Sequence, residues 1–130
     1  MITVYTEIEK SLQEVWDKFT QAEHVMKWNF ASDDWQCPQA VNNLEIGKQF
    51  IYTMAAKDGS MSFDFNGTYT EVEPLKKIAY TIEDGRKVIV TFEEINSKIV
   101  VTEIFEPEDV HPLEMQQFGW QSILNNFKNH

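Results

Sequence analysis

The stretch KKIAYTIEDGRKVIVTFEEINSKIVVTEIF, residues 76–105, decides the fold, because apolar and polar side chains alternate along most of it. A period of two is typical of half-buried β-strands, whose successive side chains point to opposite faces. The Asp84-Gly85 pair tolerates the positive φ angles of a tight hairpin turn, and Asn96-Ser97 marks a second turn. The stretch therefore predicts consecutive antiparallel strands over residues 76–83, 87–95 and 98–105.

The same alternation continues toward the N-terminus and predicts three further strands. Turn signals at Asp58-Gly59 and Pro74 separate neighbouring strands, and the first segment of the chain alternates as well. Gly47 and Gly67 fall inside predicted strands, where a missing side chain usually marks a bulge or a bend. We therefore expect a curved six-stranded antiparallel sheet whose remaining strands cover residues 2–9, 44–56 and 61–73.

Helical spacing occurs in two other parts of the sequence. Ser11 and Glu14 form a capping box in front of apolar residues that recur every three or four positions, which predicts a short helix. A second short helix is expected over 22–28, followed by a long loop over 29–43. After Pro107, helical spacing predicts one long amphipathic helix to the C-terminus. The predicted fold class is α+β, with the sheet wrapped around this helix and the two short helices between the first and second strands.

Composition and charge bound the function. The 130 residues suffice for one domain with a buried core, and we expect a single domain over 1–130. Eleven Lys and Arg against 21 Asp and Glu give a net charge of -10, which argues against partners that carry phosphates, namely nucleic acids and anionic membranes. No apolar run approaches the ~18 residues of a membrane span. The start of the chain lacks a secretion signal and Cys37 has no disulfide partner, so a cytoplasmic location is expected.

Short motifs along the whole chain resemble those of one protein superfamily. They are Val15-Trp16-Asp17, Trp28-Asn29, Trp35-Gln36-Cys37-Pro38, Gly47-Lys48-Gln49-Phe50, Lys57-Asp58-Gly59-Ser60, Phe63-Asp64-Phe65-Asn66-Gly67-Thr68-Tyr69, Asp84-Gly85-Arg86 and Gly119-Trp120. In this order they resemble the helix-grip, START-like superfamily, and within it the branch named after the activator of the ninety-kilodalton heat-shock chaperone's ATPase. The resemblance implies a cavity between the concave face of the sheet and the long helix.

The superfamily is used for several functions, so the fold does not decide the activity. Its members bind lipids, sterols, polyketides and hormones, carry out aromatase or cyclase chemistry, or regulate chaperones. The leading interpretation for this chain is a binding domain, without catalysis, for a small hydrophobic, aromatic or lipid-like molecule. One alternative is an interaction protein with a chaperone as partner, which the resemblance alone implies. The other is a cyclase-like or hydrolase-like enzyme.

Strand parity places an aromatic-rich set of side chains on the face of the sheet that would line the cavity. Such rings offer large apolar area, while their hydroxyl and indole groups add a few directional contacts, as a flat hydrophobic ligand requires. Aromatic residues on this face form a closed core in other small domains, and that alternative stays open. The predicted ligand-binding residues are Trp28, Trp35, Phe50, Tyr52, Met54, Phe63, Phe65, Tyr69, Tyr80, Phe92, Trp120 and Leu124.

The enzymatic alternative depends on one glutamate. Glu103 and Glu106 lie on opposite faces of the last predicted strand, so either parity turns one carboxyl group inward. Among aromatic groups its charged form would be destabilised and its pKa raised, as a general acid or base requires. The opposing interpretation places the inward carboxyl at the wet rim of the sheet, where most glutamates lie.

The remaining chemistry is weakly supported by the sequence. His24, His111 and His130 lie far apart in the sequence and share no metal-ligand spacing with Cys37, so we expect no bound metal. The sequence also contains no glycine-rich phosphate loop, so we expect no cofactor. Ile89 and its neighbours along the strand are apolar, so both faces of this strand carry apolar side chains. A second copy of the chain could cover the outer face of the sheet, and a homodimer is therefore an open alternative.

Overall fold

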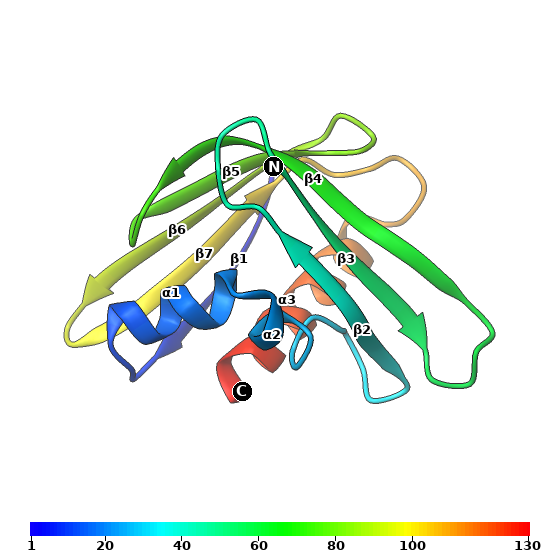
Figure 1. Cartoon of the computed structure of the whole chain (residues 1–130), viewed down its shortest axis with the longest axis horizontal. Helices are drawn as coiled ribbons and strands as arrows, with labels where there is room; N and C mark the ends of the chain where they lie inside the picture. The colour runs from blue at the N-terminus through cyan, green and yellow to red at the C-terminus, as the bar shows by residue number, and fades with distance from the viewer.

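The computed structural model describes residues 1–130 and forms a curled antiparallel sheet around helices, as predicted (Figure 1). In chain order the elements are β1 (Ile2–Ile8), α1 (Leu12–Thr20), α2 (Ala22–Val25), β2 (Trp35–Asn42), β3 (Gln49–Ala56), β4 (Ser62–Glu73), β5 (Lys77–Ile82), β6 (Lys87–Ile95), β7 (Lys98–Phe105) and α3 (Leu113–Asn129).

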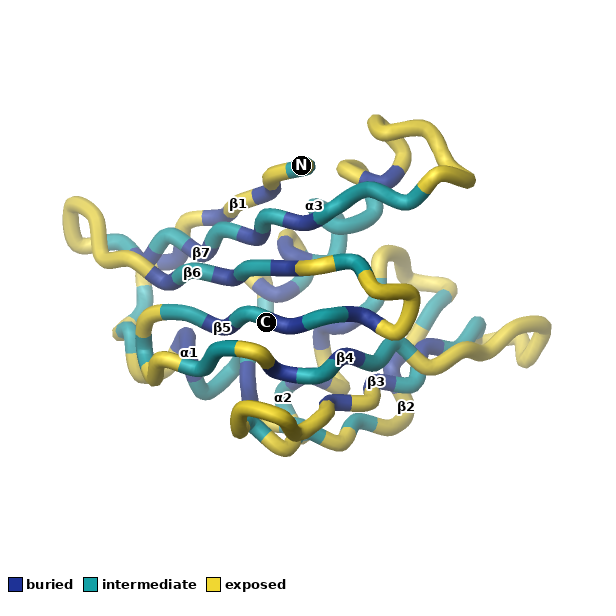
Figure 2. The backbone as a smooth tube through the Cα atoms, turned by 90° about the horizontal axis from the view of Figure 1, so that it is seen from above, coloured by how far each residue is buried: buried dark blue, intermediate teal, exposed yellow.

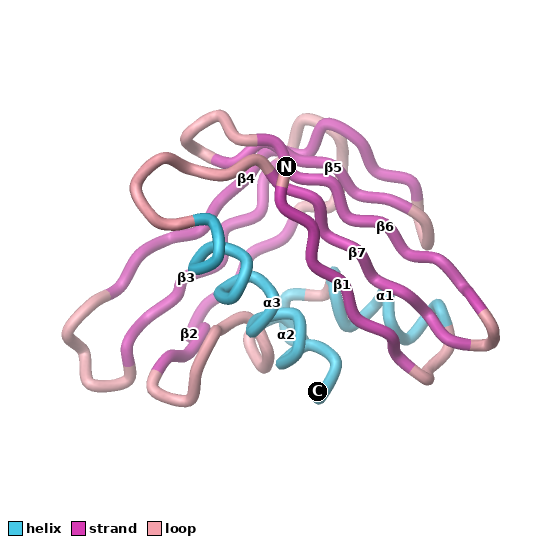
Figure 3. The backbone as a smooth tube through the Cα atoms, turned by 180° about the vertical axis from the view of Figure 1, so that it is seen from behind, coloured by secondary structure: helices cyan, strands magenta, loops and turns pink.

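Strands β2 to β7 form a meander, and β1 pairs with β7 at one edge of the sheet. The strand order is β1-β7-β6-β5-β4-β3-β2, and every neighbouring pair is antiparallel. The two short helices carry the chain from the β1 edge to the β2 edge, and all three helices lie on the concave side of the sheet (Figures 1 and 3). No helix of the structure is both long enough and apolar enough to cross a membrane.

The predicted number of six strands is wrong, because the sheet has seven. The extra strand is β2, which lies within the predicted loop over 29–43 and pairs with β3. Its pairing register shifts between Gln36 and Gln39, so a bulge that contains Pro38 interrupts the alternation on which the prediction relied. Proline is tolerated here because β2 is an edge strand, where a missing backbone N–H breaks no ladder.

The turns between strands follow the prediction more closely than the strand ends do. Asn96 and Ser97 both have positive φ angles, 52° and 67°, as a two-residue hairpin turn requires. The strand predicted from residue 44 begins only at Gln49, because Gly47 turns the chain at a φ of 84°. The helix predicted over 22–28 ends at Val25.

Alternation along the strands separates the core from the outer face, as Figure 2 shows for β5, β6 and β7. Val88, Val90 and Phe92 are buried on β6, while their neighbours are half-buried or exposed. On this concave side Trp16 and Phe19 of α1 pack edge-on against Phe92, with ring centroids 5.0 and 5.4 Å away. These three rings fill the half-barrel where α1 packs on the sheet.

Helix α3 leans toward one half of the sheet. Its contacts with strands are mainly with β1, and Trp120 stacks on Phe105 of β7 with ring centroids 3.9 Å apart and an angle of 12° between the rings. Gln121 adds two polar links to β1, since its amide accepts from the Tyr5 backbone N–H and donates to the Tyr5 carbonyl. Helix α3 does not pack on the other half of the concave face, which β3 and β4 form, and only side chains cover that half.

A candidate ligand cavity between the sheet and the C-terminal helix

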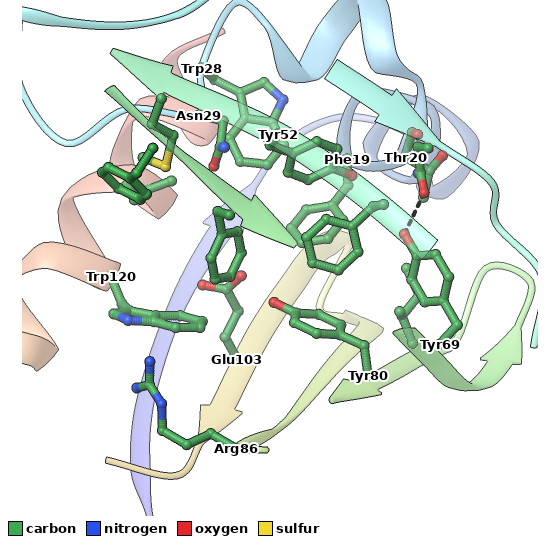
Figure 4. A pocket seen from close by; sticks show the side chains of 17 residues that line it. Phe19, Thr20, Trp28, Asn29, Tyr52, Tyr69, Tyr80, Arg86, Glu103 and Trp120 are labelled. Atoms are coloured by element: carbon green, nitrogen blue, oxygen red, sulfur yellow. Dashed lines mark hydrogen bonds between the residues drawn. The ribbon is translucent and has the colours of Figure 1, made fainter. Parts of the chain in front are cut away.

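A cavity of about 250 Å³ lies between the concave face and α3 and is partly open to solvent. Most of its lining is apolar, and it draws on α1, α3 and five of the strands (Figure 4). Phe63 belongs to the lining and is half-exposed. The lining residues are Phe19, Thr20, Trp28, Asn29, Asn42, Phe50, Tyr52, Met54, Phe63, Phe65, Tyr69, Ile78, Tyr80, Arg86, Glu103, Trp120 and Ile123.

Phe50 organises the aromatic wall on β3, β4 and β5. Its ring centroid lies 4.6 Å from that of Tyr52 and 4.8 Å from that of Tyr80, and contacts with Phe65 and Tyr69 follow at 5.5 and 5.7 Å. Tilted and edge-on contacts at these distances are the arrangements that aromatic quadrupoles favour. The wall is therefore held together mainly by its own rings.

Gly67 makes this close packing possible. A Cβ atom at that position of β4 would lie 2.6 Å from Cε2 of Phe50 and 2.9 Å from Cδ2 of Tyr80. No real Cβ atom tolerates such distances, so any side chain at residue 67 would displace both rings. The sequence predicted a bulge or a bend at Gly67, but the strand keeps its pairing register there, and the glycine instead allows two rings to approach the backbone closely.

The opposite wall comes from the helices. Trp120 of α3 is fixed by its stack on Phe105 and presents its edge to Phe65 at 6.1 Å. Trp28, which follows α2, donates its indole N–H to the Lys18 carbonyl at 2.8 Å and packs against Phe127 at 4.9 Å. Both indoles are therefore held in place by contacts within the protein.

Glu103 is the one ionisable carboxyl group in the lining. Its pairing partners are Val4 on β1 and Val90 on β6, so no neighbour on the sheet offers its carboxyl a hydrogen bond. Figure 4 shows its carboxyl and the Tyr80 hydroxyl pointing into the space beside Trp120. Burial alone raises the pKa of Glu103 from its ordinary 4.5 to about 8. At neutral pH this group is mainly a neutral acid, which can donate a hydrogen bond or a proton.

Other polar groups of the lining bond to one another. The Tyr69 hydroxyl donates to Oδ1 of Asn42 at 2.5 Å, and Nδ2 of Asn42 donates to the Thr20 carbonyl at 2.6 Å. The Thr20 hydroxyl in turn donates to the Trp16 carbonyl at 2.8 Å. This series of hydrogen bonds ties β4 to β2 and to the end of α1, and it leaves few unpaired donors on that side of the cavity.

Two further polar groups differ in how far they are satisfied. Nδ2 of Asn29 is buried without a hydrogen-bond partner, in a residue only 6% exposed. Arg86 lies at the rim, where Nε donates to Oδ2 of Asp84 at 2.8 Å and Nη1 to the Glu106 carbonyl at 3.4 Å. The guanidinium is therefore paired at the rim of the cavity, whereas Nδ2 of Asn29 has only the Cys37 thiol beside it.

The structure brings most of the predicted binding residues together around the cavity, but three lie outside its lining. Trp35 begins strand β2 instead of lying in a loop, and it packs against Phe63 with ring centroids 5.9 Å apart. Phe92 is covered by α1, and Leu124 is buried in the core on α3. The predicted residues that do line the cavity are Trp28, Phe50, Tyr52, Met54, Phe63, Phe65, Tyr69, Tyr80 and Trp120.

Of the two candidate carboxyl groups, the structure turns Glu103 inward and Glu106 outward. Oε1 of Glu106 accepts a hydrogen bond from the Lys87 backbone N–H at 2.6 Å, which holds it beside the turn between β5 and β6. No group of three or more His, Cys, Asp or Glu side chains converges in the structure. His24 and His130 do meet, with Nδ1 and Nε2 3.1 Å apart.

Several lining residues escaped the sequence analysis. Phe19 and Ile123 belong to apolar helical stripes and Ile78 to an alternating strand, so periodicity contained a signal for them. Asn29 and Asn42 fell in the supposed loop, where no period indicates which side chains turn inward. Thr20 lies at the end of a helix and Arg86 lies in a hairpin turn, so no periodic pattern indicates either residue.

Known proteins resemble this chain in sequence and structure. The profile of the Activator of Hsp90 ATPase homolog 1-like protein (AHSA1) family matches residues 9–130. The solution structure of the AHSA1-like protein from Aeromonas hydrophila is 38% identical, with a TM-score of 0.90 over 98% of this chain and 90% of that one. A solution structure from Cytophaga hutchinsonii is 47% identical, with a TM-score of 0.87 over 98% and 89%.

More distant structures show the fold alone. A crystal structure from Chromobacterium violaceum is 19% identical, with a TM-score of 0.87 over 98% of this chain and 94% of that one. No match was found among curated proteins. The fold supports a domain of the ligand-binding or regulator kind in general. Because the family profile spans nearly the whole sequence, the chain belongs to the Activator of Hsp90 ATPase homolog 1-like family, within the helix-grip superfamily.

Proposed function

We propose that this chain binds a small hydrophobic molecule, aromatic or lipid-like, in the cavity between α3 and the sheet. The observation that carries the proposal is an unfilled, partly open space of about 250 Å³ within a wall of mutually packed aromatic rings. Protein interiors normally fill such a space, because each void forfeits dispersion contacts. A volume below the roughly 300–1,000 Å³ of common ligand sites favours a ligand of about two fused rings.

The expected affinity follows from the apolar area that such a ligand would bury. A two-ring hydrocarbon that buries about 250 Å² gains roughly 6 kcal/mol from removal of apolar surface from water. The loss of translational and rotational freedom offsets part of that gain. We therefore expect weak binding of a simple hydrocarbon, and tighter binding of a ligand that also satisfies the polar groups.

The test is titration of the protein with indane, a neutral two-ring hydrocarbon, followed by calorimetry and by the melting temperature. Ile123→Trp places an indole in the cavity and is expected to weaken binding about tenfold or more, because the site then lacks room. Asn125→Trp, on the exposed side of the same helix, is the matched control and should bind like the wild type. Unchanged binding in both variants would reject the cavity as the site.

A second candidate function is regulation of a chaperone ATPase, which the description of the family names. On this chain the supporting observation is a group of exposed apolar side chains at the start of α3 and in the segment before it. It comprises Val110, Leu113, Met115 and Phe118, which are between 57% and 82% exposed.

Turnover of ATP by the heat-shock chaperone, measured with and without this chain, tests the second candidate. If the chain acts as a regulator, turnover changes, and Phe118→Asp abolishes the change because the apolar contact is lost. Lys128→Asp, at the other end of α3, changes the charge without touching that surface and serves as the control. Unaltered turnover with the wild-type chain would reject this function.

A further inference from the structure

The Glu103 carboxyl lies in the cavity wall and makes no hydrogen bond to another group of the protein, although the Tyr80 hydroxyl points into the same space (Figure 4). The neighbours across the ladder are valines, and the residues that α3 contributes to the lining, Trp120 and Ile123, are uncharged. A buried polar group normally has a partner, and leaving one unsatisfied costs about 1–3 kcal/mol. A carboxyl that opens into the cavity obtains a partner there only from whatever occupies the cavity.

No cation of the protein neutralises this carboxyl. The charged and titratable groups that line the same cavity are Arg86, from the turn between β5 and β6, and the tyrosines of β3, β4 and β5. Arg86 is paired with Asp84 and makes no ion pair with Glu103, while burial raises the pKa of Tyr52, Tyr69 and Tyr80. Glu103 therefore holds its proton at neutral pH, in keeping with a pKa of about 8.

Protonated Glu103 offers a donor to whatever occupies the cavity (Figure 4), and this donor selects for a ligand that brings an acceptor. Nδ2 of Asn29 does not take part in this selection, because it is buried out of reach of the cavity and lies beside the Cys37 thiol. Protonated Glu103 would give a bound ammonium group no charge to pair with, and ionised Glu103 would repel a bound carboxylate.

We infer that the cavity selects neutral ring compounds that carry an accepting oxygen, such as a carbonyl, and that Glu103 donates the hydrogen bond that recognises this oxygen. The inference rests on the proposed function, since it names the class of ligand for the same cavity. A hydrogen bond from a neutral acid in an apolar site also gives orientation, because it fixes one edge of a flat ligand that the rings would otherwise hold in several poses.

Three probes of nearly equal shape test this selection. Indane has no heteroatom, indanone adds a carbonyl oxygen, and aminoindane adds an amine that is protonated at neutral pH. For the wild type at about pH 6 we expect indanone to bind about tenfold more tightly than indane, which corresponds to one net hydrogen bond. Aminoindane should bind more weakly than indanone.

Two variants of Glu103 assign the preference to its hydrogen bond. Glu103→Gln keeps a donor of similar shape and should retain the preference for indanone, whereas Glu103→Met keeps the length without a donor and should lose it. Raising the pH to about 9 ionises Glu103 and should remove the preference in the wild type but not in Glu103→Gln. Melting curves establish that both variants are folded, and indane binding reports that each cavity is intact.

The outcomes separate this inference from the proposed function. Equal binding of indane and indanone to the wild type, or an unchanged preference in Glu103→Met, overturns the role of Glu103 while the cavity remains a binding site. Tighter binding of aminoindane, lost in Glu103→Gln, would show that Glu103 acts as an anion and overturns the selection for accepting oxygens. Binding of none of the three probes overturns the proposed function, and this inference with it.

Discussion

The carboxyl group of Glu103 couples the stability of this protein to pH. The unfolded chain releases that proton near 4.5, whereas the folded chain holds it up to about 8. Between these values the folded state binds more protons, so the free energy of unfolding falls as the pH rises, and the loss is complete above about pH 8.

Replacement of Glu103 by glutamine should remove this pH dependence. The variant is expected to be more stable than the wild type above about pH 5, by a margin that grows to at most about 5 kcal/mol near pH 8. Below about pH 4 the carboxyl is protonated in both the folded and the unfolded state, so the free energies of unfolding of the two proteins should differ little. Urea unfolding of both proteins across this range is the measurement, and parallel stability curves would contradict the burial of Glu103.

A second residue, Gly67, tests the aromatic wall. Gly67→Ala places a Cβ atom against Phe50 and Tyr80 and should lower the free energy of unfolding by about 1–3 kcal/mol, the usual cost of overpacking. Gly119→Ala in α3 is the control, because its Cβ meets nothing within 4 Å and alanine favours helix by up to about 1 kcal/mol. Equal stability of Gly67→Ala and the wild type would show that the wall is less tightly packed than described.

At the scale of elements, Gln116 joins α3 to the segment before it. Its buried amide accepts from the Glu108 backbone N–H at 2.9 Å and donates to the carbonyls of Glu108 and His111 at 3.0 and 2.8 Å. Gln116→Met should cost about 1–3 kcal/mol and speed hydrogen exchange of the Glu108 amide. Gln117→Met removes only an exposed 3.4 Å contact with the Thr3 carbonyl and should change stability by less than about 0.5 kcal/mol.

The elements also show how far the sequence could predict the structure. Strands whose buried and exposed residues alternate without a break, such as β6 and β7, follow from the sequence, and so do the turns with Asp-Gly and Asn-Ser pairs. The inward face of β6 was predicted, whereas that of β7 was left open between Glu103 and Glu106. Strand β2 was missed because its bulge at Pro38 breaks the period and its pairing partners lie 8–21 residues away along the chain. Periodicity reports only local order, so an irregular edge strand leaves no such signal.

The whole molecule carries a net charge of -10 with few ion pairs, all of them at least partly exposed. Repulsion among like charges disfavours the compact state, and salt screens it over about 10 Å at 0.1 M ionic strength. The melting temperature should therefore rise when sodium chloride is added at neutral pH. A lower melting temperature in salt would mean that attractive ion pairs outweigh this repulsion.

The existence of the cavity belongs to this same scale, and the sequence alone does not contain it. The residues of its walls were largely predictable from strand parity and helical stripes, because each follows from its own element. Whether the walls meet depends on how far α3 leans toward β1, which is set by the stack of Trp120 on Phe105 and by the Gln121 links to Tyr5. No local pattern reports such a tilt, so a filled core and a hollow one give the same sequence signals.

The central claim, an accessible apolar cavity under α3, is tested most directly by the four indole N–H resonances during titration with indane. Trp120 lines the cavity, whereas Trp16 and Trp35 lie outside it, and the N–H of Trp28 is bonded to the Lys18 carbonyl. We predict a saturable shift of the Trp120 resonance, with those of Trp16 and Trp35 nearly unmoved. A Trp120 resonance that stays in place, or moves no more than those two, would contradict the account.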